Sequence, residues 1–133
     1  MNDRPSWNQW GLALAATVAT RASCTRSQVG AVLMGADHRI YGVGYNGTRA
    51  GEVNCGDGGC PRGLLSYDEC PPLGSYSNCT ARHAEVNCID NSINYGYGQI
   101  AFGDLTLYVT RPCCEECLEY IRGYPEITRV VTA

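Results

Sequence analysis

The chain has 133 residues, a length that fits a single domain over residues 1–133, and 44% of them are hydrophobic, which is enough to build a core. Its formal net charge of −3 excludes the global basic field that attracts nucleic acid, so we expect no nucleic-acid partner. No apolar run is long enough to span a membrane, and residues 12–18 are a short apolar stretch without the basic flank and cleavage site of a signal peptide. The sequence therefore predicts a protein of the cytoplasm.

The first predicted element is a helix that follows Pro5, with Ser6 as its N-cap. Apolar side chains then recur at helical spacing and predict one apolar face, made of Trp7, Trp10, Leu14 and Val18. Such a face packs either in the core or against another subunit. We interpret the two tryptophans as core residues.

A β-hairpin is predicted next. Residues 29–34 are apolar and begin with a β-branched residue, residues 40–45 are the partner strand, and residues 35–39 form the turn between them. His38 in this turn is interpreted as a solvated loop residue. The segment 47–80 is long, irregular and rich in glycine, proline and cysteine, which in a compact domain indicates that something pins it or that it has a function.

The second half of the chain alternates helices and strands. Its predicted elements are a helix over 82–93, a strand over 105–110, a helix over 115–122 and a strand over 128–131. Strands that alternate with helices favour parallel pairing in this half. The complete order is α-β-β-α-β-α-β, which predicts the α/β class.

Candidate metal ligands occur in two short motifs. His83-Ala84-Glu85 opens the second predicted helix, and about thirty residues later the chain reads Pro112-Cys113-Cys114-Glu115-Glu116-Cys117. One histidine and two cysteine thiolates are ligands for zinc, and three protein ligands leave one tetrahedral position open, as in catalytic zinc sites. Glu85 lies two residues from His83, too close in sequence to be a convenient fourth ligand but well placed to move protons.

The cysteine register requires a choice between two pairs. Cys114 and Cys117 have the two-residue spacing that lets one thiolate lie in a loop and the other in the first helical turn, whereas Cys113 and Cys117 are separated by three residues. We therefore predict His83, Cys114 and Cys117 as the ligands. The alternative is a pair of buried, inert cysteines at a helix start, which the upstream His-Ala-Glu motif disfavours.

These motifs resemble the H-x-E and C-x-x-C arrangement of the zinc-dependent nucleobase and nucleotide deaminases. Further segments resemble the bacterial and phage deoxycytidylate deaminases in particular, namely 23–32, 44–47 with Gly51 and Cys55, 82–87 and 106–110. The resemblance covers nearly the whole chain and implies a cytidine deaminase-like fold, a mixed β-sheet with helices on its faces. It also implies hydrolysis of dCMP to dUMP and ammonia, which supplies the precursor of thymidylate. Arg49 and Cys113 stand where the family usually has proline.

The resemblance also implies roles for individual residues. Glu85 takes a proton from the zinc-bound water and returns protons to N3 and to the leaving amine. Asn46 resembles the residue that binds the sugar hydroxyl, and Ala84 belongs to the substrate site. Tyr108 either packs on the pyrimidine or is a buried strand tyrosine. Arg26 either binds the phosphate, which a guanidinium can hold with two hydrogen bonds, or is a surface charge.

Nine cysteines are many for this length, and an odd count with C-x-x-C spacing fits reduced metal sites better than disulfides. Relatives in the resembled family often carry a structural zinc. The resemblance implies that a second Zn²⁺ is bound by four thiolates in a closed tetrahedral site, from Cys24, Cys55, Cys60 and Cys79. Cys88 is interpreted as a core residue.

Regulation and assembly are implied by the resemblance alone. Many deoxycytidylate deaminases are activated by dCTP with Mg²⁺ and inhibited by dTTP near the segment that contains Asn46 and Gly47, and they are often hexamers. Three alternatives remain for the function: a deaminase of modified dCMP, dCTP or deoxycytidine, a tRNA adenosine deaminase, or a non-catalytic zinc-binding module. The absence of a basic surface disfavours the second, and Glu85 disfavours the third because a structural zinc site does not need that carboxylate.

Overall fold

The computed structural model describes residues 3–22, 28–47, 83–94 and 104–133. Its elements are α1 (Trp7–Ala19), β1 (Gly30–Met34), β2 (Ile40–Tyr45), α2 (Ala84–Ile89), the π-helix η4 (Asp90–Asn94), β3 (Leu105–Val109), α3 (Glu115–Arg122) and β4 (Ile127–Thr132). The π-helix continues α2 directly, so the predicted order α-β-β-α-β-α-β is confirmed.

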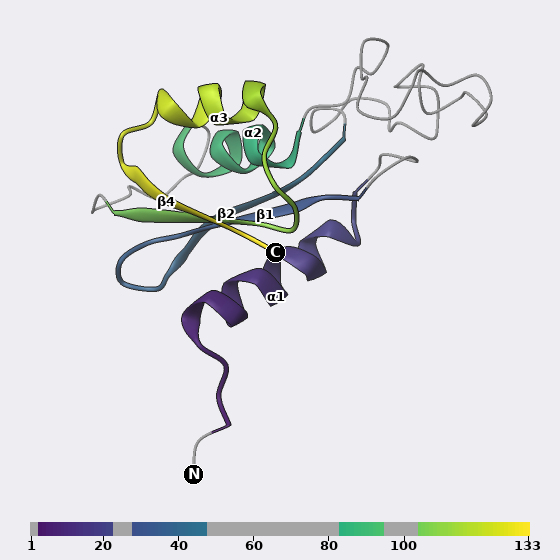
Figure 1. Cartoon of the computed structure of the whole chain (residues 1–133), viewed down its shortest axis with the longest axis vertical. Helices are drawn as coiled ribbons and strands as arrows, with labels where there is room; N and C mark the ends of the chain where they lie inside the picture. Colours follow the sequence, from purple (N-terminus) through teal and green to yellow (C-terminus); the bar gives the residue numbers. More distant parts are fainter. Residues whose placement is uncertain (1–2, 23–27, 48–82, 95–103) are drawn as a thin grey trace, which may run out of the picture.

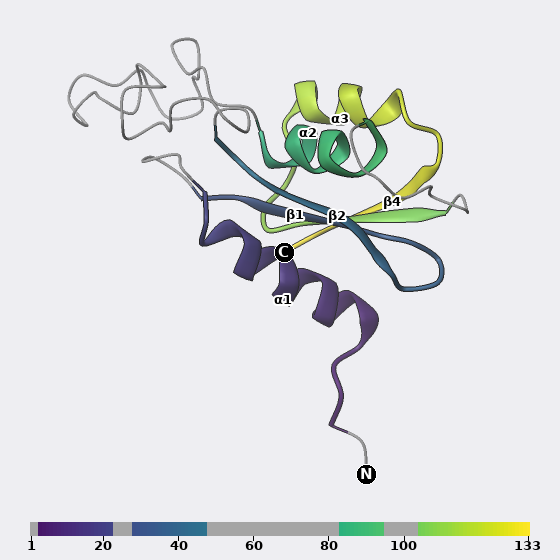
Figure 2. The ribbon, with the colours of Figure 1, turned by 180° about the vertical axis from the view of Figure 1, so that it is seen from behind.

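The four strands form one mixed sheet in the order β2-β1-β3-β4. Strand β1 pairs antiparallel with β2 and with β3, whereas β3 pairs parallel with β4. The predicted hairpin and the predicted parallel pair are both present. Figures 1 and 2 show α1 on one face of the sheet and α2 with α3 side by side on the other. None of the described helices is long and apolar enough to cross a membrane.

Each face of the sheet has its own apolar core. The core beneath α2 and α3 is built mainly from Ala31, Leu33, Ala84, Cys88, Ile89, Leu105, Leu107, Val109, Ile121 and Ile127. The core beneath α1 is smaller and consists of Ala15, Val32, Met34 and Tyr108. Strands β1 and β3 are buried along their whole length because both of their faces are covered. Cys88 is fully buried, as predicted.

The first helix begins at the predicted N-cap. The Ser6 side chain accepts a hydrogen bond from the Gln9 backbone N–H at 3.1 Å, and the Gln9 side chain accepts one from the Ser6 N–H at 2.8 Å, which forms a capping box. Trp10 packs against the core beneath α1. Trp7 does not: it is 51% exposed, and its ring stacks on the His38 ring with centroids 3.9 Å apart. The prediction that both tryptophans are core residues is therefore wrong for Trp7, and His38 is an exposed loop residue with one ring face covered.

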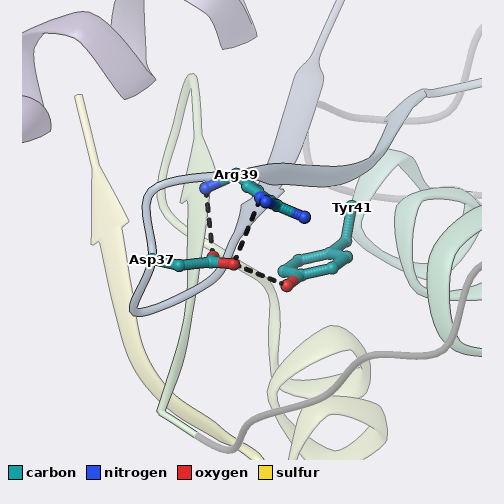
Figure 3. A network of polar contacts seen from close by, with 3 residues as sticks. All are labelled: Asp37, Arg39 and Tyr41. Atoms are coloured by element: carbon teal, nitrogen blue, oxygen red, sulfur yellow. Dashed lines mark hydrogen bonds and ion pairs between the residues drawn. The ribbon is translucent and has the colours of Figure 1, made fainter.

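The turn between β1 and β2 is organised by Asp37 (Figure 3). Its carboxylate accepts hydrogen bonds from the Arg39 backbone N–H at 3.2 Å and from the Tyr41 hydroxyl at 3.0 Å, and Arg39 Nε lies 3.6 Å from it. The His38 backbone is left-handed, with φ of 63°, and its N–H donates to the Gly35 carbonyl. These local bonds close the hairpin at the end opposite to residues 46–47.

Strand β2 meets α2 through glycines that leave no room for a side chain. A Cβ atom on Gly44 would lie 2.7 Å from both the Ala84 carbonyl oxygen and the Cys88 Cα, and closer still to the Cys88 nitrogen. A Cβ atom on Gly42 would lie 2.5 Å from the Ser92 Cβ. The helix backbone therefore rests directly on the strand, and this contact sets the position of the first turn of α2.

We expect Gly44→Ala to destabilise the fold, because the added methyl group must push α2 away from β2. Overpacking of this kind costs about 1–3 kcal/mol of unfolding free energy. Urea unfolding followed by circular dichroism measures the change. Gly123→Ala is the matched control, because Gly123 has an ordinary helical φ of −71° and its nearest new contact is at 3.3 Å. Equal stability of the Gly44→Ala and wild-type chains would show that α2 is not fixed by this contact.

Candidate metal centre and active site

The three predicted metal ligands come together where α2 and α3 begin. His83 is the N-cap residue of α2, Cys114 is the N-cap residue of α3, and Cys117 lies in the first turn of α3. The Nδ1 atom of His83 is 2.9 Å from Cys117 Sγ and 3.4 Å from Cys114 Sγ, and all three ligand atoms lie within 4.8 Å of one another. The fold thus brings residues 31 and 34 positions apart into one group.

The donor set fits a zinc ion. Bonds of about 2.3 Å to sulfur and about 2.0–2.1 Å to nitrogen, at tetrahedral angles, place such ligand atoms about 3.5 Å apart. The separation of 3.4 Å between His83 Nδ1 and Cys114 Sγ matches this value, and the 2.9 Å to Cys117 Sγ would have to widen by about 0.6 Å. Three ligands leave one position for a further group, as in catalytic zinc sites.

Glu85 lies buried beside these ligands. It occupies the first turn of α2 and is 4% exposed. Burial raises the pKa of the Cys117 thiol, and the charge of the Glu85 carboxylate raises it further. Thiols in this state must release protons when they bind zinc. A buried carboxylate needs polar partners, and the cysteines and the metal position are the partners that this arrangement offers.

Cys113 lies outside the ligand group but contacts the same carboxylate. It is half-buried against the core beneath α2 and α3. Burial, followed by the charge of Glu85 and a hydrogen bond to it, raises the pKa of Cys113 to about 12. The ligand group contains Cys114 and Cys117. This geometry agrees with the register predicted from the two-residue spacing.

Two asparagines that the sequence interpretation missed fix the helix that carries His83 and Glu85. The Asn87 side-chain amide donates to the Tyr45 carbonyl at 2.8 Å, and that of Asn91 donates to the Val43 carbonyl at 2.9 Å. Strand β2 is an edge strand of the sheet, so these bonds occupy exposed backbone acceptors. The signal in the sequence was the spacing of four, which places both amides on one side of a helix.

Asn46 directly follows β2. It lies at the end of the sheet where β3 also ends and the chain continues to the cysteines. Its side-chain oxygen accepts a hydrogen bond from the Val29 N–H at 2.7 Å, and its own N–H donates to the Val29 carbonyl at 3.2 Å. The next strand reaches the same place, because the Thr110 N–H donates to the Gly30 carbonyl. The Asn46 oxygen therefore helps to hold the open end of the hairpin.

Tyr108 points away from the metal ligands. Its ring is 2% exposed in the core beneath α1, and its hydroxyl donates to the Asn8 side chain at 2.9 Å. Leu107 and Val109, its neighbours in β3, face α2 and α3, and side chains alternate along a strand. Tyr108 is therefore the buried strand tyrosine of our second interpretation, and the fold does not bring it to the candidate site.

The remaining predicted site residues divide into two groups. Ala84 is fully buried in the first turn of α2, where its carbonyl group packs against Gly44, and Gly47 is buried after β2. The residues predicted for the second zinc and for the phosphate lie outside the described ranges, namely Cys24, Cys55, Cys60, Cys79 and Arg26. The description of the site is therefore confined to the catalytic group and its neighbours Asn46, Gly47 and Ala84.

Residues 5–133 match the family model described as the cytidine and deoxycytidylate deaminase zinc-binding region. The chain belongs to the cytidine and deoxycytidylate deaminase family. The deoxycytidylate deaminase of Mycobacterium phage D29 is 38% identical over 128 residues, which cover 96% of this chain and 94% of the phage protein. That of Schizosaccharomyces pombe is 38% identical over 86 residues, which cover 65% of this chain and 26% of the yeast protein.

A solved structure shares the fold of this deaminase family member. The dCMP deaminase from the cyanophage S-TIM5, in complex with dCMP and dUMP, matches with a TM-score of 0.70 and 20% identity over 98% of this chain and 83% of that one. The likeness confirms the predicted cytidine deaminase-like fold.

The cysteine register gives a direct prediction. We expect Cys117→Ser to lose one equivalent of zinc per chain, because serine replaces a thiolate ligand, and Cys113→Ser to retain the wild-type content. Elemental analysis of the purified chains measures both. A loss in Cys113→Ser as large as that in Cys117→Ser would move the ligand register to Cys113.

Proposed function

We propose that the protein catalyses the zinc-dependent hydrolysis of dCMP to dUMP and ammonia, and that residues 1–133 form one deaminase domain. The observation that carries the proposal is the buried Glu85 carboxylate beside a His83, Cys114 and Cys117 group with one position left open. A purely structural site has no use for this carboxylate. The phage relative that matches 96% of the chain is itself a deoxycytidylate deaminase.

The chemistry follows from the position of Glu85. Zinc, when bound, acts as a Lewis acid that lowers the pKa of water to about 7. Glu85 accepts a proton from the attacking water, and the water oxygen forms a bond to C4 of cytosine. Glu85 gives this proton to N3, then accepts the second proton from the new C4 hydroxyl and gives it to the amine. The bond between C4 and the amine nitrogen breaks, ammonia leaves, and the C4 carbonyl of uracil forms. A carboxylate that serves as base and then as acid must lie within about 3 Å of both groups.

For substrate binding we propose Asn46, Ala84 and Arg26. Asn46 and Ala84 lie at the sheet edge and the helix start that border the metal ligands. The Asn46 oxygen accepts a hydrogen bond from the Val29 N–H, which fixes the side chain that we assign to a sugar hydroxyl. Arg26 is assigned to the phosphate, and a larger rise in KM for dCMP than for deoxycytidine in Arg26→Ala would support this assignment.

The level of phosphorylation separates this function from its alternatives. Ammonia release from dCMP, CMP, deoxycytidine and dCTP, compared in one assay with wild-type enzyme, is the test. The highest kcat/KM is expected for dCMP. A preference for deoxycytidine or dCTP would replace dCMP with that substrate, and zinc-loaded protein that releases no ammonia from any of the four would favour a non-catalytic zinc module.

Glu85→Gln should lose most of the activity while keeping zinc. The amide has the size of the carboxylate but cannot transfer protons, and general acid–base effects are typically about 10²- to 10⁴-fold in rate. Steady-state kcat with dCMP measures the loss, and zinc content with circular dichroism verifies that the metal and fold are intact. Turnover near the wild-type value in the zinc-loaded variant would exclude Glu85 as the proton carrier.

We also propose a second, structural Zn²⁺ at Cys24, Cys55, Cys60 and Cys79, on the family resemblance and the closed set of four thiolates that these residues would form. Freshly purified protein should then hold two zinc ions per chain. Cys55→Ser should hold one and unfold more readily, since structural zinc contributes folding free energy directly. One zinc ion per wild-type chain, with disulfides among these cysteines, would refute the second site.

Regulation and assembly complete the proposal. On the family resemblance, dCTP with Mg²⁺ activates and dTTP inhibits at a site that includes Asn46 and Gly47, in a homo-oligomer of six subunits. Sigmoidal dCMP kinetics that become hyperbolic with dCTP would support the regulatory part, and kinetics indifferent to both nucleotides would contradict it. Light scattering measures the subunit number.

A further inference from the structure

Beyond the metal ligands, the π-helix η4 that continues α2 is joined to α3 and the turn after it by a polar cluster that we call the polar clamp. It is formed by Asp90 and Asn94 of η4, Tyr120 of α3, and Tyr124. The Tyr120 hydroxyl donates to Asp90 Oδ1 at 3.0 Å, and the Asn94 amide donates to the same oxygen at 2.8 Å. The Asn94 amide also lies 3.0 Å from the Tyr124 hydroxyl, and the two tyrosine hydroxyls are 3.3 Å apart.

The polar clamp lies on the same helix faces as the metal ligands. On α3, Cys117 and Tyr120 are three residues apart, which places them on one side of the helix, and Tyr124 follows just after the C-cap Gly123. On the other helix, Asp90 comes seven residues after His83, which is about two turns, and Asn94 comes four residues later. The pair of helices is thus joined by the ligands at one end and by hydrogen bonds at the other.

Two of the clamp residues lie in the π-helix η4, which sets the direction of their side chains. A π-turn shifts the backbone hydrogen-bond pattern by one residue. Here the Ser92 hydroxyl donates to the Cys88 carbonyl at 2.7 Å, so a buried acceptor near the shift has a side-chain partner. Asp90 and Asn94 both lie in this π-helix.

The groups in the clamp are better suited to fixing the relative position of the two helices than to stabilising their contact. Asp90 is 6% exposed, and burying a carboxylate costs free energy that an apolar pair of similar size would avoid. Burial raises the pKa of the Tyr120 hydroxyl, and its bonds to Tyr124 and Asp90 raise it further, so this hydroxyl remains a donor. Hydrogen bonds differ from apolar contacts in that they fix distance and direction.

We propose that the polar clamp positions α3 against α2 so that His83 and the two cysteine ligands converge at the spacing zinc requires. The four clamp residues are positioning residues, since none of them belongs to the ligand group. The inference rests on the proposed zinc site. It does not depend on dCMP being the substrate, because its test measures metal binding with no nucleotide present.

The test compares two tyrosine–aspartate pairs with equal hydrogen-bond lengths. Tyr120→Phe removes the hydroxyl that lies 3.0 Å from Asp90, and Tyr41→Phe removes one that lies 3.0 Å from Asp37 in the distant hairpin turn. Zinc affinity is measured by competition with a chelator. The absorption spectrum of the Co²⁺-substituted protein reports the geometry of the cysteine ligands, and thermal unfolding of each chain gives its stability.

We expect Tyr120→Phe to weaken zinc binding about tenfold and to change the Co²⁺ spectrum. Tenfold is the lower end of the loss in metal affinity that follows removal of a group that orients a metal ligand. Tyr41→Phe should leave both the zinc affinity and the spectrum unchanged.

Further variants extend the test. Asp90→Asn keeps an acceptor for Tyr120, so its zinc affinity should lie between that of the wild type and that of Asp90→Ala. If Tyr120→Phe does not fold, Asn94→Ala provides the same comparison at an exposed residue. Wild-type zinc affinity and Co²⁺ spectrum in a folded clamp variant of lowered stability would overturn the proposal.

Discussion

The candidate site depends on one constraint, which is that two helix N-termini must meet on the same face of one sheet. His83 and Cys114 are the N-cap residues of α2 and α3, and neither side chain makes a capping hydrogen bond. Serine, threonine, aspartate or asparagine is usual at an N-cap and is worth about 1 kcal/mol there. Both helices forgo this stabilisation, and their first side chains face each other instead. The positive end of the α3 dipole also favours thiolates at Cys114 and Cys117.

Because the helix starts are not capped by their own side chains, tertiary contacts must hold them. Gly44 lets the α2 backbone rest against β2, and Asn87 and Asn91 bind the same strand through its carbonyl groups. On the opposite side, Asp90 and Tyr120 join α2 and its π-helical extension to α3. The helix that carries the histidine and the glutamate is thus fixed to the sheet on one side and to its partner helix on the other.

The sequence predicted those parts of the site that local chemistry decides. The grouping of His83, Cys114 and Cys117, which we propose as zinc ligands, follows from donor type and spacing, and the N-cap Ser6 follows from its place before an apolar helical pattern. The face to which Tyr108 points could not be predicted, because β3 is buried along both faces and shows no alternation of apolar and polar residues. Which face receives α2 and α3 is decided by tertiary packing.

Trp7 and the helix-joining residues show the same limit. Helical spacing puts Trp7 in line with Trp10, but the first turn of α1 extends to the hairpin turn, where Trp7 meets His38 rather than the core. Asp90 and Tyr120 carry no motif, and their partnership exists only once the sheet has set the two helices side by side. Composition therefore predicts the class of fold and the metal chemistry, and packing determines their orientation.

The central pairing of the sheet has a consequence for how the chain reaches this state. Strand β1 pairs with β2 across a five-residue turn, but it also pairs with β3, and Gly30 bonds to Thr110 across 80 positions. Closing so long a loop is slow. We therefore expect the hairpin and α1 to form early in folding and the β1–β3 pairing to form late. The ligand group requires that pairing. Removal of the metal should then act mainly on the unfolding limb of a chevron plot, and the lifetime of the native state would depend on the same three side chains that we propose as zinc ligands.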